Sequence, residues 1–257
     1  MDPLHVVFLH TRVNGPQFHE KLGILPVIHW VERDIGLFYI KGRRRGEHVW
    51  MSTNDIVLPN FTQAGLVYES PDGSKLHYFT RNSFTRWIVP VDDTQTVVLA
   101  YRHFNSHAEH PRDEWRTKEA LEKIDISRLK SRPYAERQRD PGDYEALVGQ
   151  GPITLHDNEH LASSDVGVVR YRRRLSREIS KLSNGERPLQ PSACGISPIP
   201  TYGSDSVIHL PSEQVSDDRK AIATLLSQVA EVYQSADELI GEDRFVFLAD
   251  KLAALNV

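Results

Sequence analysis

The stretch IHWVERDIGLFYIKGRRR, residues 28–45, decides the fold, because it reads as two β-strands that meet at a tight turn. β-Branched and aromatic residues fill both halves, and the Asp-Ile-Gly triplet at 34–36 is typical of a hairpin turn. A third strand is predicted in EHVWMSTNDIVLP, residues 47–59, and three more in residues 75–104, with a turn at 92–93. Five or six neighbouring strands joined by short links predict an antiparallel sheet.

Helical patterns flank this predicted sheet. A short helix is predicted at residues 2–12, where Asp2 suits the N-cap and Pro3 the first helical position. Further helices are predicted at 113–124, 143–150, 164–183, 212–240 and 244–254. Residues 186–210 are rich in Pro, Ser and Gly and are predicted to form a loop or linker before the C-terminal helices of 211–257. Strands followed by helices predict an α+β fold, and we expect residues 1–257 to form one domain.

The composition is that of an ordinary globular protein and excludes several classes. The chain has 257 residues and a formal net charge of −4, so no basic field favours nucleic acid. No apolar run approaches the roughly 18 residues of a spanning helix, and the start lacks the apolar core of a signal peptide. We therefore expect a cytoplasmic protein with no membrane partner. Cys194 is the only cysteine, so a metal here must be held by His, Asp, Glu or water.

Two histidines near the start, His5 and His10, are candidate metal ligands. On an ideal helix five residues turn roughly 500°, so the two side chains point about 140° apart. Both can reach one ion only where the helix is bulged or frayed. A carboxylate from elsewhere would complete the 2-His-1-carboxylate set typical of non-haem Fe(II) oxygenases. The alternative is two ordinary helix histidines, one half-buried and one exposed.

Residue identity adds more than this spacing. The pattern D-P-x-H-x-x-F-L-H at 2–10 is followed by ERQRDPGDYEALVGQGPI at 136–153 and by EHLASSDVGVVRYRRRL at 159–175. Together these segments resemble the Rieske non-haem iron ring-hydroxylating oxygenases, in particular the large-subunit (alpha) catalytic domain of the phthalate dioxygenase-like branch. The segments at 50–60 and 86–104 also resemble sheet segments of this family. The resemblance covers most of residues 1–185, which would be the family-like core.

The resemblance implies a fold, a cofactor and a ligand set. The fold would be a START-like helix-grip, a curved antiparallel sheet around a long C-terminal helix. Mononuclear Fe(II) would be held by His5, His10 and Asp143. Asp2, the acidic residue before the first histidine, would connect this iron to the Rieske [2Fe-2S] cluster of a neighbouring subunit. The enzyme would use O2 to dioxygenate, monooxygenate or O-demethylate a small aromatic, carboxylated substrate, for which Arg81, Arg86 and Arg102 are candidate binding residues.

The same resemblance implies partners that this chain does not supply. A Rieske cluster needs two cysteines and two histidines, and the single cysteine cannot provide them. We therefore expect Met1 to be an internal position of a longer parent, with the Rieske domain missing from this chain. Electrons would come from a Rieske domain or subunit and a reductase, and the chain would be inactive without them. The parent enzyme would be a homo-oligomer, a trimer or hexamer.

Two other functions stay open. HDNEH at 156–160 matches the H-x-x-E-H pattern of inverted zinc proteases, with Glu231 as a possible third ligand. Against a zinc hydrolase, Asp157 and Asn158 are poor helix formers, and the segment reads as a turn between helices. A non-catalytic ligand-binding module is the second alternative, because a helix-grip cavity can hold a hydrophobic molecule without metal.

Overall fold

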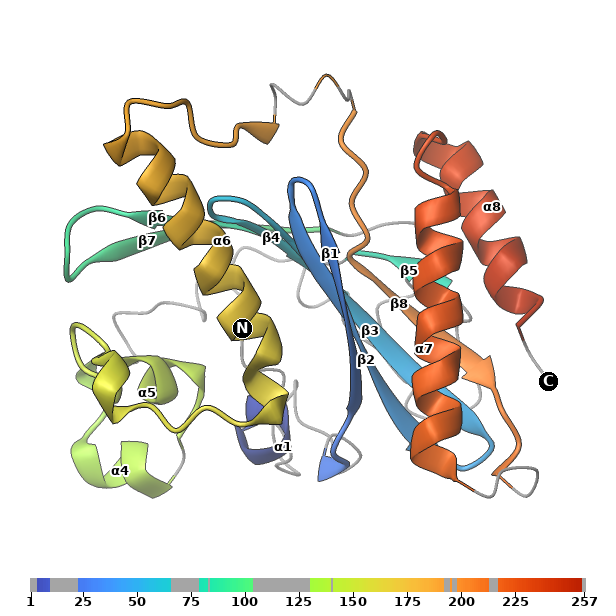
Figure 1. Ribbon diagram of the computed structural model, residues 1–257. Helices are drawn as coiled ribbons and strands as arrows, with labels where there is room; N and C mark the ends of the chain where they lie inside the picture. Colours follow the sequence, from blue (N-terminus) through green and yellow to red (C-terminus); the bar gives the residue numbers. More distant parts are fainter. Residues whose placement is uncertain are drawn as a thin grey trace.

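The computed structural model describes residues 4–9, 23–65, 79–82, 84–103, 130–139, 141–191, 195, 198–212 and 217–255. In this part of the chain eight strands form one open antiparallel sheet with helices on both faces (Figure 1). The strands are β1 (Val27–Arg33), β2 (Gly36–Arg45), β3 (His48–Val57), β4 (Phe61–Ala64), β5 (Phe79–Arg81), β6 (Phe84–Pro90), β7 (Thr96–Arg102) and β8 (Ser204–His209).

The sheet divides at β3. β2 pairs with β3 along its whole length, from Gly36 opposite Val57 to Arg45 opposite His48. The other edge of β3 is shared, because residues 48–53 pair with β8 and residues 54–57 pair with β4. From there β4 leads to β6 and β7, while β8 leads to β5. The chain thus brings its C-terminal strand into the middle of an N-terminal sheet.

The turn between β1 and β2 depends on a glycine. A Cβ at Gly36 would lie 2.0 Å from the carbonyl oxygen of Ile56 on β3, which no side chain permits. The backbone N–H of Leu58 also donates to the carbonyl of Ile35, at 2.9 Å. The predicted Asp-Ile-Gly turn therefore also fixes how closely β2 approaches the end of β3.

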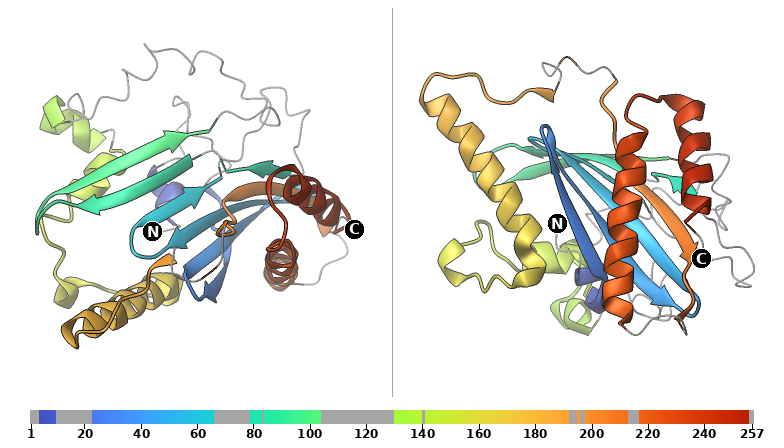
Figure 2. Two further views of the ribbon diagram at one scale, coloured as in Figure 1. Left: turned by 90° about the horizontal axis from the view of Figure 1, so that it is seen from above. Right: turned by 45° about the vertical axis from the view of Figure 1, so that its right-hand side comes forward.

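One face of the sheet is covered by the two C-terminal helices, α7 (Asp218–Ser235) and α8 (Gly241–Ala253). Phe38, Ile40 and Met51 from the sheet pack with Leu226 and Val229 of α7 in the larger buried core. Figures 1 and 2 show α7 running along this face beside α8. The predicted α+β class is confirmed, and a long C-terminal helix on an open antiparallel sheet agrees with the helix-grip prediction.

The other face carries α6 (Val166–Ser183). Leu37 and Tyr39 of β2 form a second, smaller core there, against which Trp30 and Tyr171 pack. The helix approaches the sheet closely, because a Cβ at Gly167 would lie 2.2 Å from the Trp30 ring. Alternate residues of β2 therefore face α7 and α6, so each face of the sheet has its own core.

Several predicted elements differ from the structure in their bounds. The helix predicted at 212–240 spans Asp218–Ser235, and it begins where Asp217 caps it by accepting the backbone N–H of Lys220 at 3.1 Å. The prediction of a loop or linker over 186–210 is wrong for β8. Other helices are α1 (His5–Leu9), α4 (Tyr134–Arg139) and α5 (Asp143–Val148). The helix predicted at 113–124 lies outside the described residues. None of the described helices is long and apolar enough to cross a membrane.

Candidate metal centre

The structure brings together two of the predicted iron ligands, His5 and Asp143. Nε2 of His5 lies 3.7 Å from Oδ1 of Asp143, and the two side chains are 38% and 56% exposed. His5 opens α1, and Asp143 is the first residue of α5. In Figure 1 both helices lie on the same side of the molecule as α6, away from α7 and α8.

Asp143 is positioned by the turn that precedes α5. The backbone N–H of Gly142 donates to Oε2 of Glu145 at 2.8 Å, which closes the first turn of the helix. Nη1 of Arg132 lies 3.6 Å from the other carboxylate oxygen of Glu145. This ion pair connects α5 to the residues that directly precede α4. The sequence RDPGDYE thus presents the carboxylate of Asp143 at a helix start toward α1.

The separation of these two groups fits a shared metal ion. Ligand atoms that share one ion through bonds of about 2.1 Å lie about 3 to 4 Å apart. An imidazole nitrogen and a carboxylate oxygen are also the donor types of the non-haem Fe(II) facial triad. Among the described residues no group of three potential metal-binding side chains is assembled. His10 and Asp2, the other predicted members of the site, lie outside the described residues.

The H-x-x-E-H segment adopts a different local structure from that of a zinc motif. His156–Asn158 form a single 3-10 turn, whereas the zinc motif needs both histidines on one face of an α-helix. The carboxylate of Glu159 is bound by both terminal nitrogens of Arg172 on α6, with Nη2–Oε1 at 2.7 Å, and this contact lowers the pKa of Glu159. Glu231 lies on an exposed position of α7, where its charge acts on His29 of β1. Through the ion pair of Glu159 with Arg172, residues 156–160 are held against α6.

The three candidate substrate arginines differ in their surroundings. Arg86 donates from Nε to the hydroxyl of Thr62 at 2.9 Å and acts electrostatically on Lys41. Arg81 binds Glu242 of α8 at 2.6 Å, so it belongs to the α7 and α8 side of the sheet. Arg102 pairs with Phe84 through the backbone, and its side chain lies outside the described part of the chain.

Lys41 is a candidate functional residue that no sequence motif identifies. It lies in register with Ser52 of β3, which is in turn opposite Asp205 of β8. These residues share the face that carries α6, because Tyr39, two residues before Lys41, packs there. Burial, followed by the charge of Arg43, lowers the pKa of Lys41 to about 8, while Asp205 acts in the opposite direction. The lysine can therefore exchange a proton near neutral pH.

Comparison with known proteins gives three relatives, all of them oxygenase components. The chain is 33% identical to the oxygenase subunit of tert-butanol monooxygenase / tert-amyl alcohol desaturase from Aquincola tertiaricarbonis, over 93% of this chain and 54% of that protein. It is 30% identical to the phenoxybenzoate dioxygenase subunit alpha of Ectopseudomonas oleovorans, over 73% of this chain and 42% of that protein. It is 25% identical to the 5,5'-dehydrodivanillate O-demethylase oxygenase subunit of a Sphingobium strain, over 81% of this chain and 47% of that protein.

No protein-family model matches the chain. The chain spans about half the length of the curated relatives it matches. The first relative matches almost the whole chain, and the other two match most of it, so the likeness extends beyond the short motifs at residues 2–10 and 136–175. The resemblance inferred from those motifs is confirmed, and the chain belongs to the family of the Rieske-type oxygenase subunits.

Proposed function

We propose that this chain is the catalytic portion of a Rieske-type oxygenase in which His5, His10 and Asp143 hold mononuclear Fe(II). The observation that carries the proposal is the 3.7 Å separation of His5 and Asp143, which lie far apart in the sequence. When bound, the iron supplies the site at which O2 is activated beside the substrate. The reaction is a dioxygenation, a monooxygenation or an O-demethylation.

The side chains of the site have separate tasks in this proposal. The imidazoles of His5 and His10 and the carboxylate of Asp143 hold the metal and leave its other positions open. The closed turn before α5 keeps the Asp143 carboxylate directed at His5. Asp2 would accept a hydrogen bond from a ligand histidine and so orient the imidazole, and a Rieske [2Fe-2S] cluster on another domain or subunit would supply the electrons.

The substrate is a small aromatic molecule with an anionic group. Two relatives are named for phenoxybenzoate and dehydrodivanillate, which favours an aromatic carboxylate, whereas the third is named for the aliphatic tert-butanol and tert-amyl alcohol. Lys41 and Arg86 give the α6 side of the sheet two interacting cations. A protonated amine or guanidinium on this face would attract a carboxylate, and an Arg can bind it with two hydrogen bonds. A reductase is a further partner, and the assembled enzyme is a homo-oligomer.

Metal analysis of single variants tests the ligand set. The chain is reconstituted with Fe(II) without oxygen, and bound iron is measured per chain. We expect His5→Ala and Asp143→Ala to lose the iron, whereas Asp2→Asn keeps it because Asp2 is not one of the proposed ligands. The matched control, His156→Ala, keeps its iron because that histidine lies in a separate 3-10 turn.

Other results would support the alternatives. Zinc bound by the native chain and lost only in His156→Ala would overturn the oxygenase and favour a zinc hydrolase. A native chain that binds no metal, yet binds a hydrophobic ligand, would favour a non-catalytic helix-grip module. Iron retained in both His5→Ala and Asp143→Ala would show that the ligand set is wrong.

A further inference from the structure

A cavity of about 290 Å³ is lined by β5, the segment 198–204 and the junction between α7 and α8, and it is open to solvent on one side. In Figure 1, α7 and α8 lie away from α1 and α5, the helices that carry His5 and Asp143. The volume of the cavity lies just below the usual range of small-molecule pockets, about 300 to 1,000 Å³, so its size suits a small molecule such as one with a single ring. The proposed oxygenase site makes no use of this space.

Aromatic side chains from four elements form the apolar part of the wall. The Phe79 ring of β5 lies 5.3 Å from that of Phe245 on α8 and 6.3 Å from that of Tyr233 on α7, measured between ring centroids. Tyr202, before β8, lies 6.5 Å from Tyr233. Such distances are those of interacting aromatic rings, and a further planar ring could join the group.

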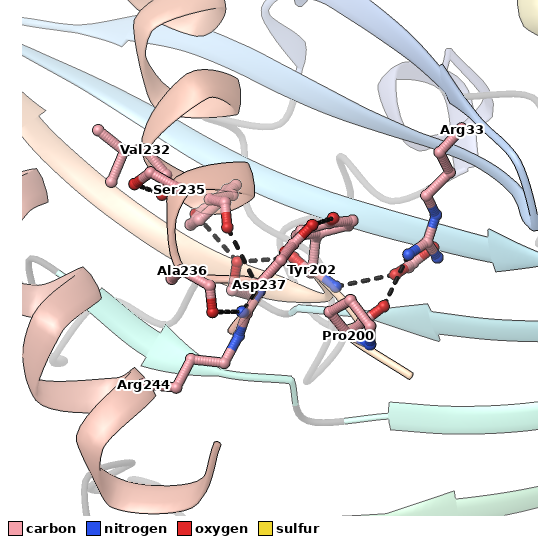
Figure 3. A network of polar contacts seen from close by, with 11 residues as sticks. Arg33, Pro200, Tyr202, Val232, Ser235, Ala236, Asp237 and Arg244 are labelled. Carbon is pink, nitrogen blue, oxygen red and sulfur yellow. Dashed lines mark hydrogen bonds and ion pairs between the residues drawn. The ribbon is translucent and has the colours of Figure 1, made fainter. Parts of the chain in front are cut away.

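One charged pair in the wall is fully engaged within the protein. The guanidinium of Arg244 donates to the carbonyls of Ala236 and Tyr233 and lies 3.4 Å from the Asp237 carboxylate (Figure 3). The other oxygen of Asp237 accepts the hydroxyl of Tyr202 at 2.7 Å. This network fixes the α7 and α8 junction, and Arg244 matches the charge of the Asp237 carboxylate, which lies in the cavity wall with its side chain 36% exposed.

The second arginine is held more loosely. Arg81 binds Glu242 at 2.6 Å, but the side chains are 38% and 61% exposed, and exposed ion pairs contribute only about 0 to 1 kcal/mol. Its guanidinium lies 4.7 Å from the centre of the Phe245 ring, so it reaches the edge of the aromatic wall. An arginine so placed can exchange an exposed carboxylate for that of a ligand at little cost.

We propose that this cavity is a second ligand site, which binds a small aromatic carboxylate. The ring lies among Phe79, Phe245 and Tyr202, and the carboxylate is bound by Arg81 in place of Glu242. An apolar, aromatic cavity with few placed polar groups has the character of a small-molecule site, and a planar guanidinium matches a carboxylate with two hydrogen bonds. The site needs no metal and is independent of the proposed oxygenase reaction.

Benzoate is the probe, and benzamide, its neutral analogue of the same shape, is the comparison. Binding to the iron-free chain is followed by calorimetry and by the melting temperature. We expect saturable binding of one benzoate, at least tenfold weaker binding of benzamide, and at least tenfold weaker benzoate binding in Arg81→Gln. The matched control is Arg219→Gln, an exposed arginine of α7 that does not line the cavity, and it leaves the affinity unchanged.

Further variants separate this site from the metal centre. Ile240→Trp places a large ring at the cavity wall and abolishes binding without removing a charge. Asp143→Ala keeps benzoate binding, because the proposed iron ligands take no part. Equal affinities for benzoate and benzamide, or binding lost in Asp143→Ala but kept in Arg81→Gln, would overturn the second site. Neither result bears on whether His5 and Asp143 hold iron.

Discussion

Arg33 of β1 binds the fully buried carboxylate of Asp55 on β3, across the intervening strand β2. Asp55 also accepts the backbone N–H of Tyr202 at 2.8 Å, and Arg33 donates to the carbonyl of Pro200 at 2.6 Å. The pair therefore joins the N-terminal strands to the segment that leads into β8. That segment is also one wall of the cavity at the α7 and α8 junction.

Removing one partner of this pair is expected to be costly. Asp55→Ala leaves a mostly buried guanidinium without its carboxylate, and such a loss costs about 3 to 5 kcal/mol of unfolding free energy. Urea unfolding of the variant measures the loss. The double variant Arg33→Met with Asp55→Ala should recover part of it, because no unpaired charge remains. A double variant less stable than Asp55→Ala alone would contradict this account.

Metal binding should stabilise the native chain more than its ligand variants. If His5 and Asp143 bind Fe(II) in the folded state only, saturation at about 100 times Kd adds about 2.7 kcal/mol. For a chain of this size that raises the melting temperature by about 5 to 10 °C. The measurement is anaerobic thermal unfolding with and without Fe(II). Asp143→Ala should show no such increase, and an equal increase in both proteins would place the metal elsewhere.

Lys41 should make stability depend on pH. Its pKa is about 8 in the folded chain against 10.5 for an ordinary lysine, so the unfolded chain binds the extra proton between these values. The contribution of this residue to stability therefore rises with pH from 8 to 10 and is lowest, and constant, below 8. Replacement by an uncharged side chain of similar length removes this dependence.

The corresponding variant is Lys41→Met. At pH 7 it should be more stable than the native chain, by up to about 3 kcal/mol, and the advantage should vanish near pH 10. Denaturant unfolding across this pH range measures the difference, with the exposed Lys220→Met as the control that shows none. If Lys41 also attracts the substrate carboxylate, the Kd of an aromatic carboxylate should rise in Lys41→Met while the bound iron is unchanged. An advantage independent of pH would refute the role of the buried charge.

The sequence predicts the strands of the N-terminal part of the sheet better than it predicts the strand that the C-terminal half of the chain adds. Alternation and turn residues identify the hairpin around residue 36, the third strand and the strands of 75–104. They miss β4 (Phe61–Ala64) and β8, whose sequence SDSVIH begins with three polar residues. Those residues are buried because β8 has partners on both edges and because Ser204 donates to the hydroxyl of Tyr233 at 2.9 Å. These contacts satisfy the buried polar groups only in the folded chain, so the local sequence does not reveal them.

The site shows the same limit. The proximity of Asp143 to His5 follows from the family resemblance, since no periodicity relates two residues so far apart. Lys41 was missed for a different reason, because alternation in YIKG gives its face but neither its burial nor its neighbours Ser52 and Asp205. The cavity was missed as well, since it is formed by segments that meet only in the folded chain.

Gly167 should be required for the packing of α6 against the sheet. A Cβ at this position would lie 2.2 Å from the Trp30 ring, and that ring is held against Tyr39 at 4.2 Å between centroids. In Gly167→Ala the ring must move or α6 must lift, which costs about 1 to 3 kcal/mol, whereas the better helix propensity of alanine returns at most about 1 kcal/mol. The net effect is a loss of stability, measured by urea unfolding.

Repeating the Gly167→Ala substitution in a Trp30→Leu variant tests whether the loss of stability comes from the contact with the Trp30 ring. Trp30→Leu removes the ring that the new methyl group would meet, so Gly167→Ala should cost little stability in that variant. The loss of stability in the double variant should therefore differ from the sum of the two single losses by about 1 kcal/mol. Ser176→Ala, at an exposed position of the same helix, should be neutral or slightly stabilising in both backgrounds. Equal costs of Gly167→Ala with and without Trp30 would show that the glycine serves the helix itself. If Gly167→Ala lowers the stability only when Trp30 is present, the glycine is required for the contact between α6 and the sheet.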